Sequence, residues 1–147
     1  LGNLEYRLGR FRNAAKQFET AAHTFAGMGD RLALGMVQLN RANLEKSLDH
    51  YRSARRLYAR ARSNPELAGR PRELAHVDYG EAQLRGFAGE YRAALNLLEA
   101  AYQHARRAGE LNLAAACDLD QAELFLRVNQ FRNGYHRCAP LSKAKWL

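Results

Sequence analysis

The chain has 147 residues, of which 47% are hydrophobic and only three are proline, so it can bury a core and reads neither as disordered nor as a linker. No apolar run approaches the roughly 18 residues needed to span a bilayer, so no membrane association is expected. Basic residues outnumber acidic ones by 23 to 15, giving a net charge of +8, which attracts acidic partners of any kind without specifying one.

The two cysteines, Cys117 and Cys138, are too few and too far apart in sequence for a disulfide framework or a paired-cysteine zinc site. The N-terminus lacks the basic-then-apolar layout of a secretory signal. We therefore expect a cytoplasmic location. Because the chain starts at Leu1 and inside a repeat, we also expect it to be part of a longer protein.

Helices are the only elements that the sequence predicts. Apolar side chains recur at three-to-four-residue spacing, as they do from Phe11 to Phe25, and no alternating strand pattern occurs. In chain order we predict helices over residues 1–8, 11–27, 31–48, 51–64, 72–87, 91–108, 110–128 and 131–139. The last of them should kink or stop near Cys138, because Pro140 removes a backbone hydrogen bond at a cost of about 3 kcal/mol.

Residues suited to turns separate the predicted helices. Glycines that favour the left-handed conformation at a helix end stand at Gly29, Gly69 and Gly109. Shorter breaks within each pair of helices are predicted at Gly9, Asp49, Gly89 and Asn129.

The sequence repeats itself every 40 residues. An aromatic residue followed by arginine recurs at Phe11, Tyr51, Tyr91 and Phe131. A small residue follows three places later, at Ala14, Ala54, Ala94 and Gly134, and leucine precedes at Leu4, Leu44, Leu84 and Leu124. The period therefore predicts one array over 1–147, with helical hairpins as units over about 1–29, 30–69, 70–109 and 110–147. The first unit is truncated and the last is degenerate.

These residues resemble the tetratricopeptide repeat family, whose Leu-Gly, aromatic, Ala and large-residue pattern is matched by Leu1-Gly2, Phe11, Ala14 and Phe18. The chain departs from the family in its period, 40 residues rather than about 34. The resemblance implies an all-α, right-handed α-solenoid of about four antiparallel helical hairpins. The segment DLDQAELFLRVNQF is similar to the arrays that precede bacterial CHAT-type peptidase domains, but no peptidase residues are present.

In that family the first helix of each hairpin lines a concave groove. This places four amide and acid side chains at the same phase of the repeat, in one ladder, namely Asn3, Asn43, Gln83 and Glu123. The resemblance therefore implies a partner-binding groove formed by Asn3, Arg7, Leu39, Asn43, Lys46, Tyr79, Gln83 and Glu123. A clamp for a terminal carboxylate is not expected, because Leu39 and Tyr79 stand where the family's clamp has lysine. The alternative is that the ladder only stabilises adjacent hairpins.

Other clusters favour no chemistry of their own. An arginine run, Arg52, Arg55, Arg56, Arg60 and Arg62, is expected to form a solvated or acid-paired convex face rather than a nucleic-acid site. The five histidines fall at unrelated phases of the repeat, and no metal or phosphate-binding signature occurs, so we expect neither enzyme activity nor a cofactor, metal or small-molecule substrate.

The function predicted from the sequence is a scaffold or sensor that binds a protein or peptide, within a larger CHAT-type signalling or peptidase protein. Two alternatives are a regulatory segment of a signalling ATPase or transcription regulator and, third, nucleic-acid binding by the convex arginines. Self-association of the terminal units also remains open, because neither end carries polar capping residues.

Overall fold

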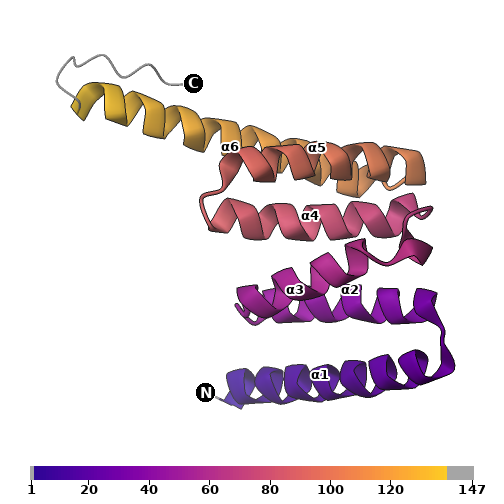
Figure 1. Cartoon of the computed structure of the whole chain (residues 1–147). Coiled ribbons are helices and arrows are strands. Elements are labelled where there is room, and N and C mark those ends of the chain that lie inside the picture. The colour runs from indigo at the N-terminus through magenta and orange to yellow at the C-terminus, as the bar shows by residue number, and fades with distance from the viewer. Residues whose placement is uncertain (1, 139–147) are drawn as a thin grey trace.

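The computed structural model describes residues 2–138, with side chains from residue 9 to residue 129. Within that part of the chain the fold is all-α, as predicted, and contains no strand. Its elements are α1 (Gly2–Met28), α2 (Arg31–Ser47), α3 (Tyr51–Arg62), the 3-10 helix η1 (Pro65–Leu67), α4 (Pro71–Phe87), α5 (Tyr91–Ala108) and α6 (Leu111–Cys138). Figure 1 shows the helices stacked in chain order, with α1 and α6 outermost.

The four central helices begin and end within two residues of the predicted bounds, and they form two hairpins, α2–α3 and α4–α5. Each helix packs against the next one in the chain. In addition, α2 contacts α4, and α4 contacts α6. The first helices of the predicted units therefore lie next to one another, as the second helices cover them from one side.

Four chain reversals share one hydrogen-bond pattern. At each of them a residue in the left-handed conformation follows the helix, with φ of 71° at Gly29, 60° at Asp49, 77° at Gly89 and 73° at Gly109. The backbone N–H of the next residue then donates to the carbonyl five places earlier, as in His50 to Glu45 and Glu90 to Arg85, both 2.9 Å. This bond satisfies a carbonyl that the helix end leaves without a partner.

The predicted breaks at Gly9 and Asn129 are wrong, because both residues lie inside continuous helices. The segments predicted as 1–8 and 11–27 form the single helix α1, and those predicted as 110–128 and 131–139 form α6. A turn leaves backbone groups unpaired and is stable only when tertiary packing compensates for them. At these two places no hairpin folds back, so two of the four predicted hairpins are absent and the backbone stays helical.

The join between the hairpins is the most irregular, as its two prolines suggest. The prediction that Gly69 ends a helix in the left-handed conformation is wrong; the chain passes through η1 instead. The side chain of Asn64 accepts from the backbone N–H of Glu66 at 3.0 Å and donates to the carbonyl of Arg31 at 2.6 Å. Gly35 makes room for this contact, since a Cβ there would lie 2.5 Å from Nδ2 of Asn64.

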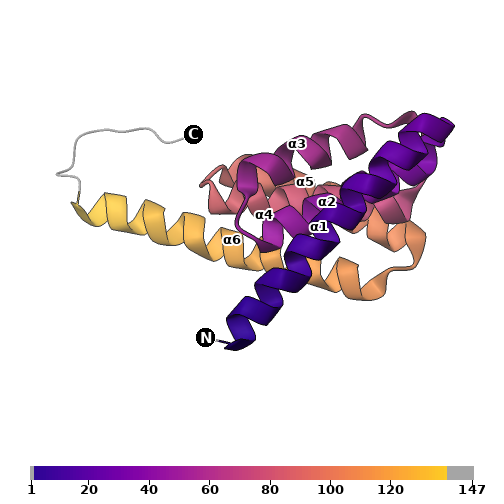
Figure 2. The same cartoon turned by 90° about the horizontal axis from the view of Figure 1, so that it is seen from below.

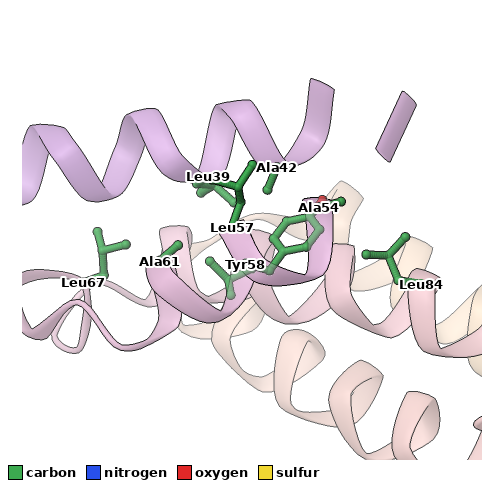
Figure 3. Close-up of a cluster of buried hydrophobic side chains, with 9 residues drawn as sticks. Leu39, Ala42, Ala54, Leu57, Tyr58, Ala61, Leu67 and Leu84 are labelled. Atoms are coloured by element: carbon green, nitrogen blue, oxygen red, sulfur yellow. The ribbon is translucent and has the colours of Figure 1, made fainter. Parts of the chain in front are cut away.

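The main core lies between α2, α3 and α4 (Figure 3). Tyr58 is its largest fully buried side chain, and its hydroxyl donates to the side-chain oxygen of Asn43 at 2.6 Å. A second core joins α4, α5 and α6 around Leu98 and Cys117. Ala54 and Ala94, the small residues of the repeat, are fully buried where two helices approach closely, as their spacing predicted.

Candidate functional site

A row of polar side chains crosses the face formed by α2, α4 and α6. The ammonium of Lys46 donates to Oε1 of Gln83 at 2.6 Å, and Nε2 of Gln83 donates to Oδ2 of Asp120 at 3.5 Å. Each bond joins residues 37 positions apart, so the row links neighbouring first helices of the repeat. We call Lys46, Gln83 and Asp120 the polar row.

The polar row is half-buried, and burial changes the protonation equilibrium of Lys46. Desolvation lowers the pKa of Lys46, and attraction to Asp120 offsets part of that effect. Beside the row, burial raises the pKa of Tyr79 to about 12, and the charge of Asp120 adds to the shift. The basic side chain of Lys46 lies at the α2 end of the row, and the acidic side chain of Asp120 lies at the α6 end.

A shallow cleft opens beside the row, between α4 and α6. Its volume is about 230 Å³. Phe87 stands at its edge with 63% of its surface exposed, and its ring lies 5.7 Å from that of Tyr51. The lining residues are Ala82, Gln83, Gly86, Phe87, Leu98, Asp120, Glu123, Leu124 and Arg127. The cleft combines an apolar floor with charged groups at its rim, a composition suited to a peptide side chain.

The residues predicted to form a groove have different environments in the structure. Lys46 and Gln83 lie in the polar row, and Tyr79 lies beside it. Glu123 lines the cleft and accepts from Arg127 at 2.8 Å. The predicted positions Asn3 and Arg7 lie outside the side chains that the structure describes.

Two other predicted groove residues take part in packing. Leu39 is buried in the main core, so a ligand could reach it only by displacing that core. Asn43 accepts the hydroxyl of Tyr58 and thereby joins α2 to α3. The bond of Asn43 lies within the hairpin α2–α3, whereas those of Gln83 link α4 to α2 and to α6. Asp120 was not predicted, because it lies three positions from the ladder column.

The arginine run on α3 divides into paired and unpaired members. Arg62 contacts Asp78 at 2.5 Å and Glu81 at 3.0 Å, and Arg55 contacts Glu90 at 3.4 Å. These two arginines therefore join α3 to the following hairpin, which agrees with the acid-paired face that was predicted. The other members, Arg52, Arg56 and Arg60, are exposed.

A buried acid that the sequence analysis missed lies under this face. Asp78 is 3% exposed, and its carboxylate contacts Arg62 and, at 3.1 Å, Nδ1 of His104. Its sequence signal was a charged residue between buried Val77 and Gly80 on α4. Burial raises the pKa of Asp78, and the two cationic partners offset part of this rise.

Cys117 is buried as well, and burial followed by repulsion from Asp120 raises the pKa of its thiol to about 11. A protonated, buried thiol is a poor nucleophile. Among the side chains described, those of residues 9–129, no cluster of three or more His, Cys, Asp or Glu is arranged to hold a metal ion. Over the same residues, no helix has the length and apolar character to cross a membrane.

Comparison with known proteins found no matching family model, no matching curated protein and no matching solved structure. The features of the chain that bear on its function are therefore the repeat, the polar row and the cleft.

Proposed function

We propose that this chain is a non-catalytic protein-interaction module, a tetratricopeptide-like α-solenoid that binds an extended peptide across α2, α4 and α6. The observation that carries the proposal is the polar row beside the cleft. The row offers charged groups to a peptide backbone or side chain, and the cleft offers an exposed aromatic ring and an apolar floor. The module would act as a cytoplasmic scaffold or sensor within a larger protein, of the CHAT-associated kind that its last unit resembles.

The experiment is a selection of phage-displayed random peptides on the whole chain, followed by fluorescence polarisation with the enriched peptides. We expect Phe87→Ala to weaken the binding of such peptides about tenfold, because aromatic anchors carry much of the energy of such interfaces. Arg56→Ala is the control, since Arg56 is exposed on α3, away from the cleft. The proposal fails if no peptide is enriched, or if Phe87→Ala binds as tightly as the wild type.

A salt titration separates this function from nucleic-acid binding. Binding in the cleft should change little between low and moderate salt, whereas contacts to phosphates weaken steeply. A labelled single-stranded DNA serves as the competing probe. The proposal would be replaced if the chain bound this DNA but no peptide, and if Arg56→Ala lost the DNA binding. The arginine face of α3 would then be the functional surface.

A further inference from the structure

The outermost helix α6 has an apolar stripe that no other helix of the described chain covers. Its buried side, with Ala114, Cys117 and Leu124, packs toward α4 and α5. The stripe lies on the opposite side, where Leu119 and Leu126 have 69% and 64% of their surface exposed. Its members follow helical spacing and are Leu111, Ala115, Leu119, Ala122 and Leu126.

The internal repeat identifies what normally covers this stripe. In α2 the residues 80 positions earlier than Leu119 and Ala122 are Leu39 and Ala42, and both are buried against α3. In α4 the counterpart of Ala122 is Ala82, which is also buried, in the core that α4 shares with α5. The cover is therefore the second helix of a hairpin. At Asn129, in the column of Asp49 and Gly89, the chain does not turn back, because α6 continues to Cys138. Figure 2 shows α6 as one unbroken helix.

The opposite end of the stack has the complementary deficiency. By its place in the repeat, the part of α1 after Arg10 is a second helix, and the first helix that should precede it runs on in line with it. Its columns Ala14, Phe18 and Ala21 correspond to Ala54, Tyr58 and Ala61, which are fully buried in α3. In α1 these three residues are only half-buried, because α1 packs against α2 alone.

The two helices that carry these open faces have opposite net charge over their described side chains. Between residues 9 and 28, α1 has three basic residues and one acid, Arg10, Arg12, Lys16 and Glu19. Between residues 111 and 129, α6 has three acids and one basic residue, Asp118, Asp120, Glu123 and Arg127. Opposite net charge favours pairing of α6 with α1, and like charge disfavours pairing of α6 with a second α6.

We propose that the chain associates head to tail with further copies of itself, α6 of one copy packing antiparallel against α1 of the next. The contact repeats the hairpin packing within the chain, with Leu119 and Ala122 of one copy in the places that Leu39 and Ala42 hold against α3. The interface is heterologous, so a dimer retains one free α1 and one free α6, and assembly continues beyond a dimer. This inference does not depend on the peptide-binding function.

The test uses two interface variants and sedimentation velocity over about a hundredfold range of concentration. Leu119→Glu with Leu126→Glu disables α6, and both side chains are exposed, so the fold should persist. Phe18→Glu disables α1. Because Phe18 also packs on α2, Arg12→Glu with Lys16→Glu provides a second α1 variant that changes exposed residues only. Asn96→Glu, on the exposed side of α5, is the charge control.

We expect the wild type and Asn96→Glu to sediment faster as concentration rises, to species larger than a dimer. Each interface variant alone should stay monomeric, and an equimolar mixture of the α6 and α1 variants should give a complex of two chains that grows no further. A wild type that is monomeric at every concentration overturns the proposal. So does a dimer that is lost in the α6 variant and retained in both folded α1 variants, because that result indicates α6 pairing with α6.

Discussion

The ring of Tyr58 occupies the space directly over Gly80: a Cβ built on Gly80 would lie 2.3 Å from Cζ and Oη of that ring. Tyr58 is fully buried, and its hydroxyl is held by Asn43 on α2. One side chain of α3 thus fixes how closely α2 and α4 approach, and this contact joins the two hairpins.

We therefore expect Gly80→Ala to destabilise the chain by about 1–3 kcal/mol, because the ring has to move to admit the methyl group. Gly86→Ala, in the same helix, is the matched control: its Cβ would meet Leu124 at 3.6 Å, an ordinary contact. The control should gain about 0.5–1 kcal/mol, since alanine favours helix. Urea unfolding followed by circular dichroism measures both, and equal effects would contradict the role given to Tyr58.

The close approach of helices at Ala54 makes a second prediction. Ala54 is fully buried, so Ala54→Leu should cost about 1–3 kcal/mol through overpacking. Ala59→Leu on the same helix adds the same volume at an exposed position and should change stability by less than about 0.5 kcal/mol. Thermal unfolding distinguishes the two. An unchanged melting temperature in Ala54→Leu would mean that the packing at this column is looser than described.

Asp78 makes stability depend on pH. Its pKa is raised above the ordinary value of 3.8 in the folded chain, chiefly by burial, although Arg62 and His104 lower it. The folded state therefore binds this proton more tightly than the unfolded state does. The contribution of Asp78 to stability is greatest below about pH 3.8 and decreases as the pH rises through its folded pKa.

Asp78→Asn removes this titration. We expect the stability of the variant relative to the wild type, measured as the difference in free energy of unfolding, to increase as the pH rises from 3.8 through the folded pKa of Asp78. Urea titrations at a series of pH values measure the difference. Two curves that remain parallel throughout would show that the pKa of Asp78 is not raised.

The thiol of Cys117 should be unreactive in the folded chain, because it is buried and its pKa is raised to about 11. In a Cys138→Ser background it is the one remaining cysteine. We expect a disulfide reagent such as DTNB to label it only in step with unfolding, so added urea should accelerate the reaction. Rapid labelling of the folded chain at neutral pH would place Cys117 at an accessible surface.

The 40-residue period was sufficient to predict the central helices, because each turn there is supported by packing on both sides. Asp49 and Gly89 stand where the chain folds back within the hairpins α2–α3 and α4–α5. Gly9 stands in the same column and is a glycine, as Gly89 is. No turn forms at Gly9, because α1 packs against α2 alone and has no neighbour on its outer side. Local sequence therefore predicted where a turn is permitted, and tertiary packing determined where one occurs.

The candidate site was predictable only in part, for a geometric reason. The period placed Asn43 and Gln83 in one column, but the observed bonds join Lys46 to Gln83 and Gln83 to Asp120, three residues short of a full period. Columns in a repeat give which residues share a helix face. They do not give how far one helix is shifted along its neighbour, because that shift depends on the side-chain packing between the two helices.

That three-residue offset gives the polar row a direction. At a rise of about 1.5 Å per residue, each step between helices moves the contact about 4.5 Å along the helix axis. A peptide that follows the row would cross α2, α4 and α6 on a slant, from the ammonium of Lys46 to the carboxylate of Asp120. Its two orientations would then be chemically distinct, and the proposed binding mode would favour the one that sets an acidic group against α2 and a basic group against α6.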